Sequence, residues 1–289
     1  MTTSSILPNN FADYCASGTK FTEKMVSVSD NVQLRVIEFH PKKATKQPTA
    51  LFVPGWISLM KGWKVVLMEM TKDFHIIYAE TREKITSQVV GKAVFSVEAI
   101  ANDIVTLVDI YKLKKDKYII FGSSLGGTSI LESYKDLQQI PLCFALLGPN
   151  AEYRTPLWGK LLMRIIWPGL YNTLRPFIKW YLRKFRLDIE TDRAQYEKYC
   201  NALDAADPKK LKPGALALSK YKVWDILGDI DLPVLIIGAS KDLLHEPQNL
   251  IQMDKMLPNS TLLDMETNTF AHGPKLVYEI RKYIASLIK

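Results

Sequence analysis

The string Gly122-Ser123-Ser124-Leu125-Gly126-Gly127 combines residue types and a spacing that could do chemistry. It follows the apolar run at residues 118–121 and precedes a helical pattern, which indicates a sharp turn between a strand and a helix. In such a turn the flanking glycines leave the hydroxyl of Ser124 exposed at a helix N-terminus, whose partial positive charge favours a developing anion. Ser124 is therefore a candidate nucleophile. The structural alternative is a glycine-rich turn with a serine that caps the helix.

This motif and its setting resemble the α/β-hydrolase superfamily, in which GHSLGG is a common sequence at the nucleophile of esterases and lipases. The resemblance extends from Val26 to the C-terminus and is less clear over residues 151–231. It implies a nucleophile, an acid and a histidine in that order along the chain. Such a set is needed because a serine hydroxyl is a poor nucleophile until an oriented base accepts its proton.

The resemblance assigns the base to His272 and the acid to Asp242. His272 stands between the last expected strand and the last helix, and Asp242 stands in the loop after the apolar run at residues 234–237. Some members of the superfamily take the acid from the end of the preceding strand. In this chain that position offers only Asn150 and Glu152.

Two backbone amides are expected to stabilise the oxyanion that forms when the serine attacks a carbonyl carbon. One is the amide of Leu125, directly after the nucleophile, and the other is that of Trp56 in Val53-Pro54-Gly55-Trp56. The superfamily usually has His-Gly where this chain has Pro-Gly, but Gly55 keeps the backbone freedom of that loop. Each such donor contributes about 3–4 kcal/mol where it has been measured. Trp56 could equally be a buried aromatic residue after a tight turn, and both interpretations can hold together.

The elements that must position these residues alternate between short apolar runs and amphipathic helices. This order predicts an α/β fold: a mostly parallel central sheet with helices on both faces, as in α/β-hydrolases. The predicted strands are a hairpin at 22–29 and 32–39, followed by 50–53, 75–79, 117–121, 142–147, 234–237 and 261–265. Residues 1–150 and 232–289 are expected to form the hydrolase core. Residues 151–231 show only helical patterns and are expected to form an inserted cap or lid.

Residues 152–186 of this insertion are basic and aromatic, with Glu152 as the only acidic residue. Basic segments that carry Trp and Phe commonly lie in a membrane interface. The alternative is a pair of cap helices whose aromatic side chains, such as Trp158, Trp167 and Trp180, cover the active site while the cations are solvated. Either arrangement favours an apolar acyl chain or an aromatic ester over a sugar.

Composition and charge narrow the classes of protein further. The chain has 289 residues, of which 47% are hydrophobic and 24% charged, with a net charge of +8, as in an ordinary globular protein. No nucleic-acid-binding motif accompanies the positive charge, so no nucleic-acid partner is expected. The three cysteines are far apart and form no pattern typical of a zinc site or disulfides. No signal peptide or membrane span is evident, and these features together predict a cytoplasmic location.

The sequence thus predicts a serine hydrolase that cleaves small esters of apolar acyl or aromatic groups through an acyl-enzyme, with no metal and no cofactor. His40 and His75 stand at strand ends before the serine and have no role in this scheme. A thioesterase or acyltransferase could use the same residues, since only the acceptor differs. A non-catalytic hydrolase fold that binds a ligand is the remaining alternative, and the oligomeric state is left open.

Overall fold

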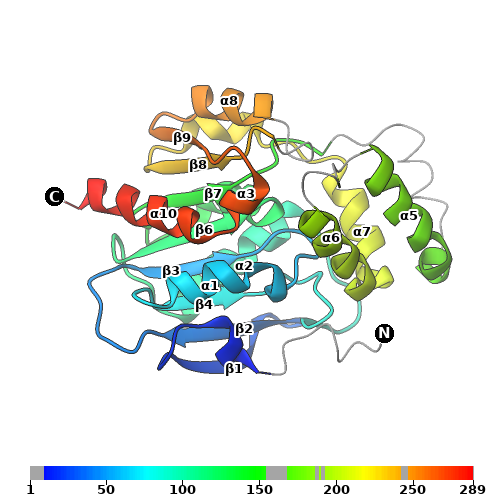
Figure 1. Cartoon of the computed structure of the whole chain (residues 1–289), viewed down its shortest axis with the longest axis horizontal. Coiled ribbons are helices and arrows are strands. Elements are labelled where there is room, and N and C mark those ends of the chain that lie inside the picture. The colour runs from blue at the N-terminus through cyan, green and yellow to red at the C-terminus, as the bar shows by residue number, and fades with distance from the viewer. Residues whose placement is uncertain (1–9, 154–167, 186–188, 190–192, 242–246, 289) are drawn as a thin grey trace.

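A computed structural model describes residues 10–153, 168–185, 189, 193–241 and 247–288. Within these ranges the centre of the molecule is a nine-stranded sheet with the order β1-β2-β4-β3-β6-β7-β8-β9, and β5 pairs with β2. The strands from β4 to β9 along this order run parallel to one another. Strand β2 is antiparallel to both of its neighbours, β1 and β4 (Figure 1). The bounds are β1 Lys20–Ser29, β2 Val32–His40, β3 Thr49–Val53, β4 Ile76–Ala79, β5 Gln88–Val89, β6 Tyr118–Ser123, β7 Phe144–Leu147, β8 Val234–Gly238 and β9 Ser260–Asp264.

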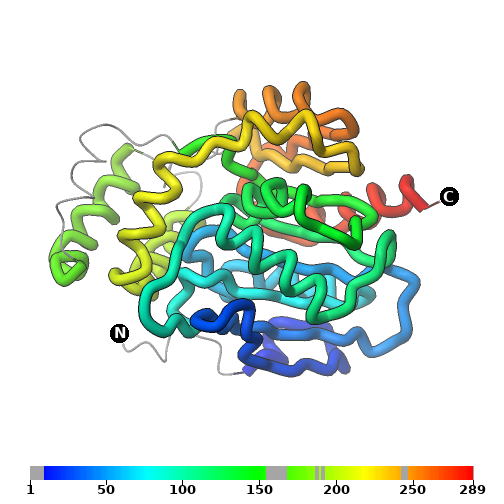
Figure 2. Tube along the Cα trace, turned by 180° about the vertical axis from the view of Figure 1, so that it is seen from behind, coloured from blue at the N-terminus to red at the C-terminus, as the bar shows by residue number. Residues whose placement is uncertain are grey.

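Two layers of helices bury the two faces of this sheet. Apolar side chains of α1 and α10 pack on one face, and those of α2, α3 and α8 pack on the other, which is in front in Figure 2. The strands are buried on both faces, which explains their nearly continuous apolar sequences. The helices of these layers are α1 Lys64–Met70, α2 Val97–Ile110, α3 Leu125–Ser133, α8 Pro247–Met256 and α10 Pro274–Leu287, with the short α9 Asn268–Ala271 before α10.

Three further helices form a group beside the sheet, at the side where its parallel strands end (Figure 1). They are α5 Tyr171–Phe185, α6 Arg193–Ala205 and α7 Pro208–Leu218. They come from the segment that the sequence assigned to a helical cap, and we call them the cap helices. The described part of this segment is helical as predicted, apart from turns and one isolated bridge between Glu152 and Lys222. Its role as a lid stays a prediction.

The predicted strands are confirmed, with small shifts at their ends. The run at 142–147 pairs only from Phe144 onwards, and the segment between β3 and β4 forms a 3-10 turn, Met60–Trp63, followed by α1. The two-residue strand β5 was not predicted, because its length is too short for an alternating pattern. None of the described helices has the length and apolar character that crossing a membrane requires.

Candidate active site

Ser124 lies at the turn between β6 and α3 with a strained backbone. Its φ of 50° and ψ of −119° are unusual for a residue with a side chain, and such strain persists only where the surroundings enforce it. The enforcing contacts include two backbone hydrogen bonds. The amide of Ser124 donates to the carbonyl of Leu147 at 2.9 Å, and its carbonyl accepts from the amide of Thr128 at 3.0 Å. The Ser124 side chain makes no capping hydrogen bond, so it does not serve as a helix cap.

Glycines are required in the motif because neighbouring parts of the chain approach its backbone closely. A Cβ atom on Gly122 would lie 2.3 Å from the Ile130 side chain and 3.0 Å from the backbone of Gly126. A Cβ atom on Gly126 would lie 2.2 Å from the carbonyl oxygen of Val53, at the end of β3. The turn therefore packs directly against the loop that follows β3.

The same close packing brings the expected oxyanion loop to the serine. A Cβ atom on Gly55 would lie 3.1 Å from Cβ of Ser124. Gly55, Trp56 and Ser124 line one cavity, and Leu125 is buried as the first residue of α3. The structure thus brings both segments that were expected to supply the amides to the same place. The role of Leu125 and Trp56 as oxyanion donors stays a prediction.

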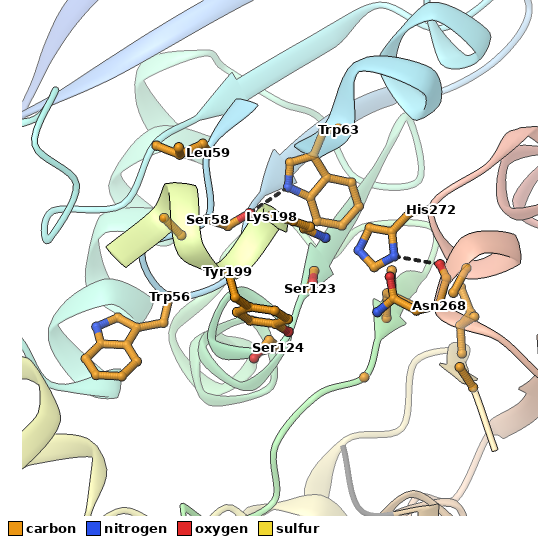
Figure 3. Close-up of a pocket in the computed structure, with 17 residues that line it drawn as sticks. Trp56, Ser58, Leu59, Trp63, Ser123, Ser124, Lys198, Tyr199, Asn268 and His272 are labelled. Carbon is orange, nitrogen blue, oxygen red and sulfur yellow. Dashed lines mark hydrogen bonds between the residues drawn. The ribbon is translucent and has the colours of Figure 1, made fainter. Parts of the chain in front are cut away.

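His272 lines this cavity together with Ser124 (Figure 3). It lies between α9 and α10, and its ring packs against the indole of Trp63 with 4.8 Å between the ring centroids. Its Nδ1 atom is 3.0 Å from the carbonyl oxygen of Asn268. A carbonyl oxygen can only accept a hydrogen bond, so Nδ1 carries a proton, and in the neutral ring the lone pair is then on Nε2. That is the form of histidine that a general base needs.

Asp242, the predicted acid, lies outside the described residues, so its position relative to His272 stays a prediction. The described residues before it are informative, because Ile237 and Ala239 line the cavity and the loop after β8 therefore begins at its wall. Of the two alternative positions, Glu152 forms an ion pair with Lys222 at 3.5 Å.

Asn150, the other alternative position, contacts the nucleophile itself. Its side-chain amide donates to Oγ of Ser124 at 2.7 Å. Thr128 holds Asn150 in place, since its hydroxyl accepts from the backbone amide of Asn150 at 3.0 Å and lies 2.9 Å from its carbonyl oxygen. The sequence suggests Asn150 only as a substitute for the acid and does not indicate this contact. The available signal was its place at the carboxyl end of the strand next to the nucleophile strand.

A buried ion pair supports the loop that follows β3. Nζ of Lys84 lies 2.9 Å from Oε1 of Glu83 and also donates to the carbonyl of Gly55, while the amide of Ile57 donates to Glu83 at 3.3 Å. The loop is thus held on both sides of Trp56. Burial by itself would raise the pKa of Glu83, but the Lys84 ammonium and the hydrogen bonds outweigh it and lower that pKa, so the carboxylate is charged.

Helix α7 of the cap is attached to this same pair. Nζ of Lys210 donates to the carbonyl oxygens of Lys84 at 2.7 Å and of Ser87 at 2.6 Å, and burial lowers the pKa of Lys210. These contacts of Glu83, Lys84 and Lys210 were not predicted. The run of charged residues directly after the buried strand β4 is a signal for the first two, and Lys210 has none.

Helix α6 of the cap contributes the residues that cover the cavity at Ser124. The sequence had suggested that aromatic residues of 152–186 would cover it. Lys198, Tyr199 and Ala202 of α6 line it, and Nζ of Lys198 lies 5.1 Å from the centre of the Trp63 ring. Trp158 and Trp167 lie outside the described residues, and Trp180 is 50% exposed. Figure 3 shows Tyr199 beside Ser124 and Trp63 beside His272. Apolar and aromatic residues thus form much of the cavity wall, and Ser58, Ser123, Lys198 and Asn268 add polar groups beside Ser124 and His272.

Comparison with known proteins supports the fold. No family model and no curated protein matches the sequence. Among solved structures, the chain is similar to an esterase from Thermogutta terrifontis, with 18% identity, a TM-score of 0.74 and coverage of 93% of this chain and 100% of that one. A putative lipase from Acinetobacter baumannii gives 19% identity, a TM-score of 0.69 and coverage of 99% and 97%. An enol-lactonase from Burkholderia xenovorans gives 14% identity, a TM-score of 0.68, and coverage of 94% of this chain and 98% of that one.

These likenesses confirm the predicted fold, and at such low identities they show the fold alone. The parallel sheet, the turn after β6 and the helices on both faces make this chain an α/β-hydrolase fold.

The close approach at Gly126 can be tested by adding a single methyl group. Gly126→Ala should lower the free energy of unfolding by about 2 kcal/mol or more, since overpacking against fixed atoms typically costs about 1–3 kcal/mol. Gly228→Ala is the matched control, because a Cβ atom there meets nothing within 4 Å. Chemical denaturation of both variants measures the difference. Equal stability of the two would show that β3 and the turn are not packed as described.

Proposed function

We propose that this protein is a serine hydrolase that cleaves carboxylic esters through an acyl-enzyme. One observation carries the proposal. Ser124, on a strained turn, shares a cavity with His272, whose Nδ1 atom is hydrogen-bonded to the carbonyl oxygen of Asn268. The esterase, lipase and lactonase among the similar structures support this choice of reaction within a fold that also serves other chemistries.

The proposed reaction begins when Oγ of Ser124 attacks the carbonyl carbon of the ester and Nε2 of His272 accepts the hydroxyl proton. The amides of Leu125 and Trp56 donate to the oxyanion of the tetrahedral intermediate. The intermediate collapses, the ester C–O bond breaks, and His272 returns the proton to the leaving alcohol. Water then attacks the acyl-enzyme with His272 as the base, which releases the acid and restores Ser124.

Asp242 is proposed to orient His272 during this cycle. A carboxylate at Nδ1 stabilises the imidazolium that forms when His272 takes the proton, and a carbonyl oxygen does so less well because it bears no net charge. Asp242 would then share the single Nδ1–H with the carbonyl oxygen of Asn268 in a bifurcated hydrogen bond, in which the carbonyl holds the tautomer and the carboxylate supplies the charge. Asn150, which donates to Oγ of Ser124, would keep the hydroxyl oriented before attack.

The apolar character of the surroundings supports an acyl or aromatic substrate. Besides the cavity at Ser124, a second cavity of about 260 Å³ lies between the cap helices α5 and α7 and the loop after β3. Trp56 lines both cavities, so the two are neighbours across one indole ring. The second cavity has mostly apolar walls: Trp56, Ile57, Pro168, Tyr171, Leu174, Ile178, Leu203, Pro208, Leu211, Lys212 and Ala215. An apolar chain could be buried there while its carbonyl group reaches Ser124.

The nucleophile is tested by covalent labelling with a fluorophosphonate probe. Ser124→Ala should abolish both labelling and ester hydrolysis, while the melting temperature changes little because one small oxygen is removed. Ser123→Ala is the matched control and should label like the wild type. Loss of labelling in Ser123→Ala but not in Ser124→Ala would show that the nucleophile is misassigned. A folded wild type that is never labelled would instead favour a ligand-binding protein.

The acid is tested by Asp242→Asn, which should lower kcat by about 10⁴-fold, as removal of the orienting acid does in a serine triad. Asp231→Asn is the control, because Asp231 precedes β8 at the opposite edge of the sheet and should leave kcat unchanged. A panel of nitrophenyl esters of increasing chain length provides the assay and defines the acyl preference. Wild-type kcat in Asp242→Asn would mean that another group orients His272.

We also propose that helix α5 makes a peripheral contact with anionic membranes. Phe177, Trp180 and Phe185 are 50–60% exposed, and their rings touch, with centroid distances of 5.5 Å and 5.8 Å. Arg183 and Lys184 are exposed on the same helix. Aromatic rings together with cations suit the interface of an anionic bilayer. Arg175 and Lys179, in contrast, pair with Asp204 of α6 at 3.3 Å and 2.6 Å and belong to the internal contacts of the cap.

Sedimentation with vesicles tests this membrane contact. The wild type should bind anionic vesicles at low salt and less at high salt, since each cation near such a surface contributes about 1 kcal/mol. The double variant Arg183→Gln/Lys184→Gln should bind less at equal salt, without any change in hydrolysis of a small soluble ester. Lys42→Gln/Lys43→Gln, which removes the same charge from an exposed loop after β2, is the control. Wild type that stays in the supernatant would rule the contact out.

A further inference from the structure

A cluster of two histidines and one glutamate lies outside the candidate active site. Glu38 and His40 are two residues apart near the end of β2, so their side chains lie on the same face of the sheet. The antiparallel register of β2 and β4 pairs Phe39 with Ile76, so the next pair along is His40 and His75. Side chains of directly opposed residues lie close together. The sheet therefore brings these three residues to one point.

The atoms of this cluster that could bind a metal converge. Oε2 of Glu38 lies 3.6 Å from Nε2 of His40 and 3.8 Å from Nε2 of His75, and one possible ligand atom from each residue lies within 4.8 Å of the other two. The two imidazole rings are stacked, with 4.2 Å between their centroids, so their lone pairs lie in nearly parallel planes and the exposed His40 has to rotate for both nitrogens to face one ion. In a tetrahedral zinc site, ligand atoms at about 2.1 Å from the ion are about 3.4 Å apart. The observed separations come close to that value, and His40, which is 48% exposed, has room to adjust.

The neighbours of the cluster leave these atoms available. Nε2 of His75 is buried and has no hydrogen-bond partner among the described residues, whereas Nδ1 of His75 lies 3.4 Å from the hydroxyl of Thr49. A partner on the far nitrogen is the arrangement that orients a histidine for metal binding. Lys24 pairs with Oε1 of Glu38 at 2.9 Å, which leaves Oε2 facing the histidines.

We propose that Glu38, His40 and His75 bind a divalent transition-metal ion of the zinc class, with Oε2 and the two Nε2 atoms as the protein ligands and water completing the coordination. Imidazole nitrogens together with one carboxylate suit Zn²⁺, Co²⁺, Ni²⁺ or Cu²⁺, whereas Mg²⁺ and Ca²⁺ prefer oxygen ligands only. Sequence analysis found no metal pattern, because the ligands come from two strands that the fold alone brings together.

The role of this site is structural. His75 lies directly before β4, at the edge where the parallel strands begin, whereas Ser124 follows the carboxyl end of β6. An ion bound there cannot reach the reacting atoms. It would instead join the end of β2 to the start of β4 and stabilise that edge of the sheet.

The experiment is a titration of metal-free protein with ZnCl₂, followed by calorimetry and by the melting temperature. Saturating Zn²⁺ should bind with one-to-one stoichiometry and raise the melting temperature on the order of 5 °C, since a ligand that binds only the native state stabilises it. MgCl₂ at the same concentration should have no effect. Co²⁺ in place of Zn²⁺ should give the intense visible absorption of a four-coordinate site.

Variants assign the binding to the cluster. Glu38→Gln and His40→Gln should each weaken Zn²⁺ binding by more than about 100-fold, because loss of an outer-shell partner already costs roughly 10–100-fold. Glu23→Gln is the matched control: Glu23 lies on β1 and pairs with Arg35, so binding should be unchanged. Lys24→Gln should tighten binding, since it removes a competing cation. Absence of binding to the wild type, or equal binding by Glu38→Gln and Glu23→Gln, would overturn the proposal.

Discussion

The close approach between the loop after β3 and the turn after β6 is the constraint on which the candidate active site depends. There is no room for a side chain between Gly126 and the carbonyl of Val53, and a Cβ atom on Gly55 would lie 3.1 Å from Cβ of Ser124. This proximity requires a strained backbone at Ser124, whose φ is 50°. Because the two segments share one contact surface, the serine hydroxyl and the loop amides form a single rigid unit.

Buried charged side chains next to the loop after β3 stabilise its conformation. Three ionisable side chains, Glu83, Lys84 and Lys210, are buried next to the loop, and isolated charges in such a place would be very unfavourable. They are tolerated because Lys84 neutralises Glu83 and because Lys210 donates to two carbonyl oxygens. The carbonyl of Gly55 and the amide of Ile57 each hydrogen-bond to one member of the ion pair, so the pair fixes the loop conformation in a way that apolar packing could not.

The sequence predicts the parts of this structure that are encoded locally. The turn at Ser124 follows from its glycine spacing between a strand and a helix, and most strands follow from short apolar runs. His272 was found through resemblance and does lie in the cavity of Ser124. The contact between Asn150 and Ser124 depends instead on which strands are neighbours. The position of α6 over the cavity depends on how the cap helices pack. No local sequence pattern predicts this position or the contact between Asn150 and Ser124.

The hydrogen bonds of Lys210 attach helix α7 of the cap to the segment that follows β4. Displacement of α7 from the core would separate the ammonium of Lys210 from both of its carbonyl acceptors. It would also disturb Lys84, whose side chain holds Gly55. A movement of the three cap helices as one body would therefore disturb the loop after β3. Any rearrangement of the cap that leaves this loop intact therefore has to keep α7 docked and is confined to α5 and α6.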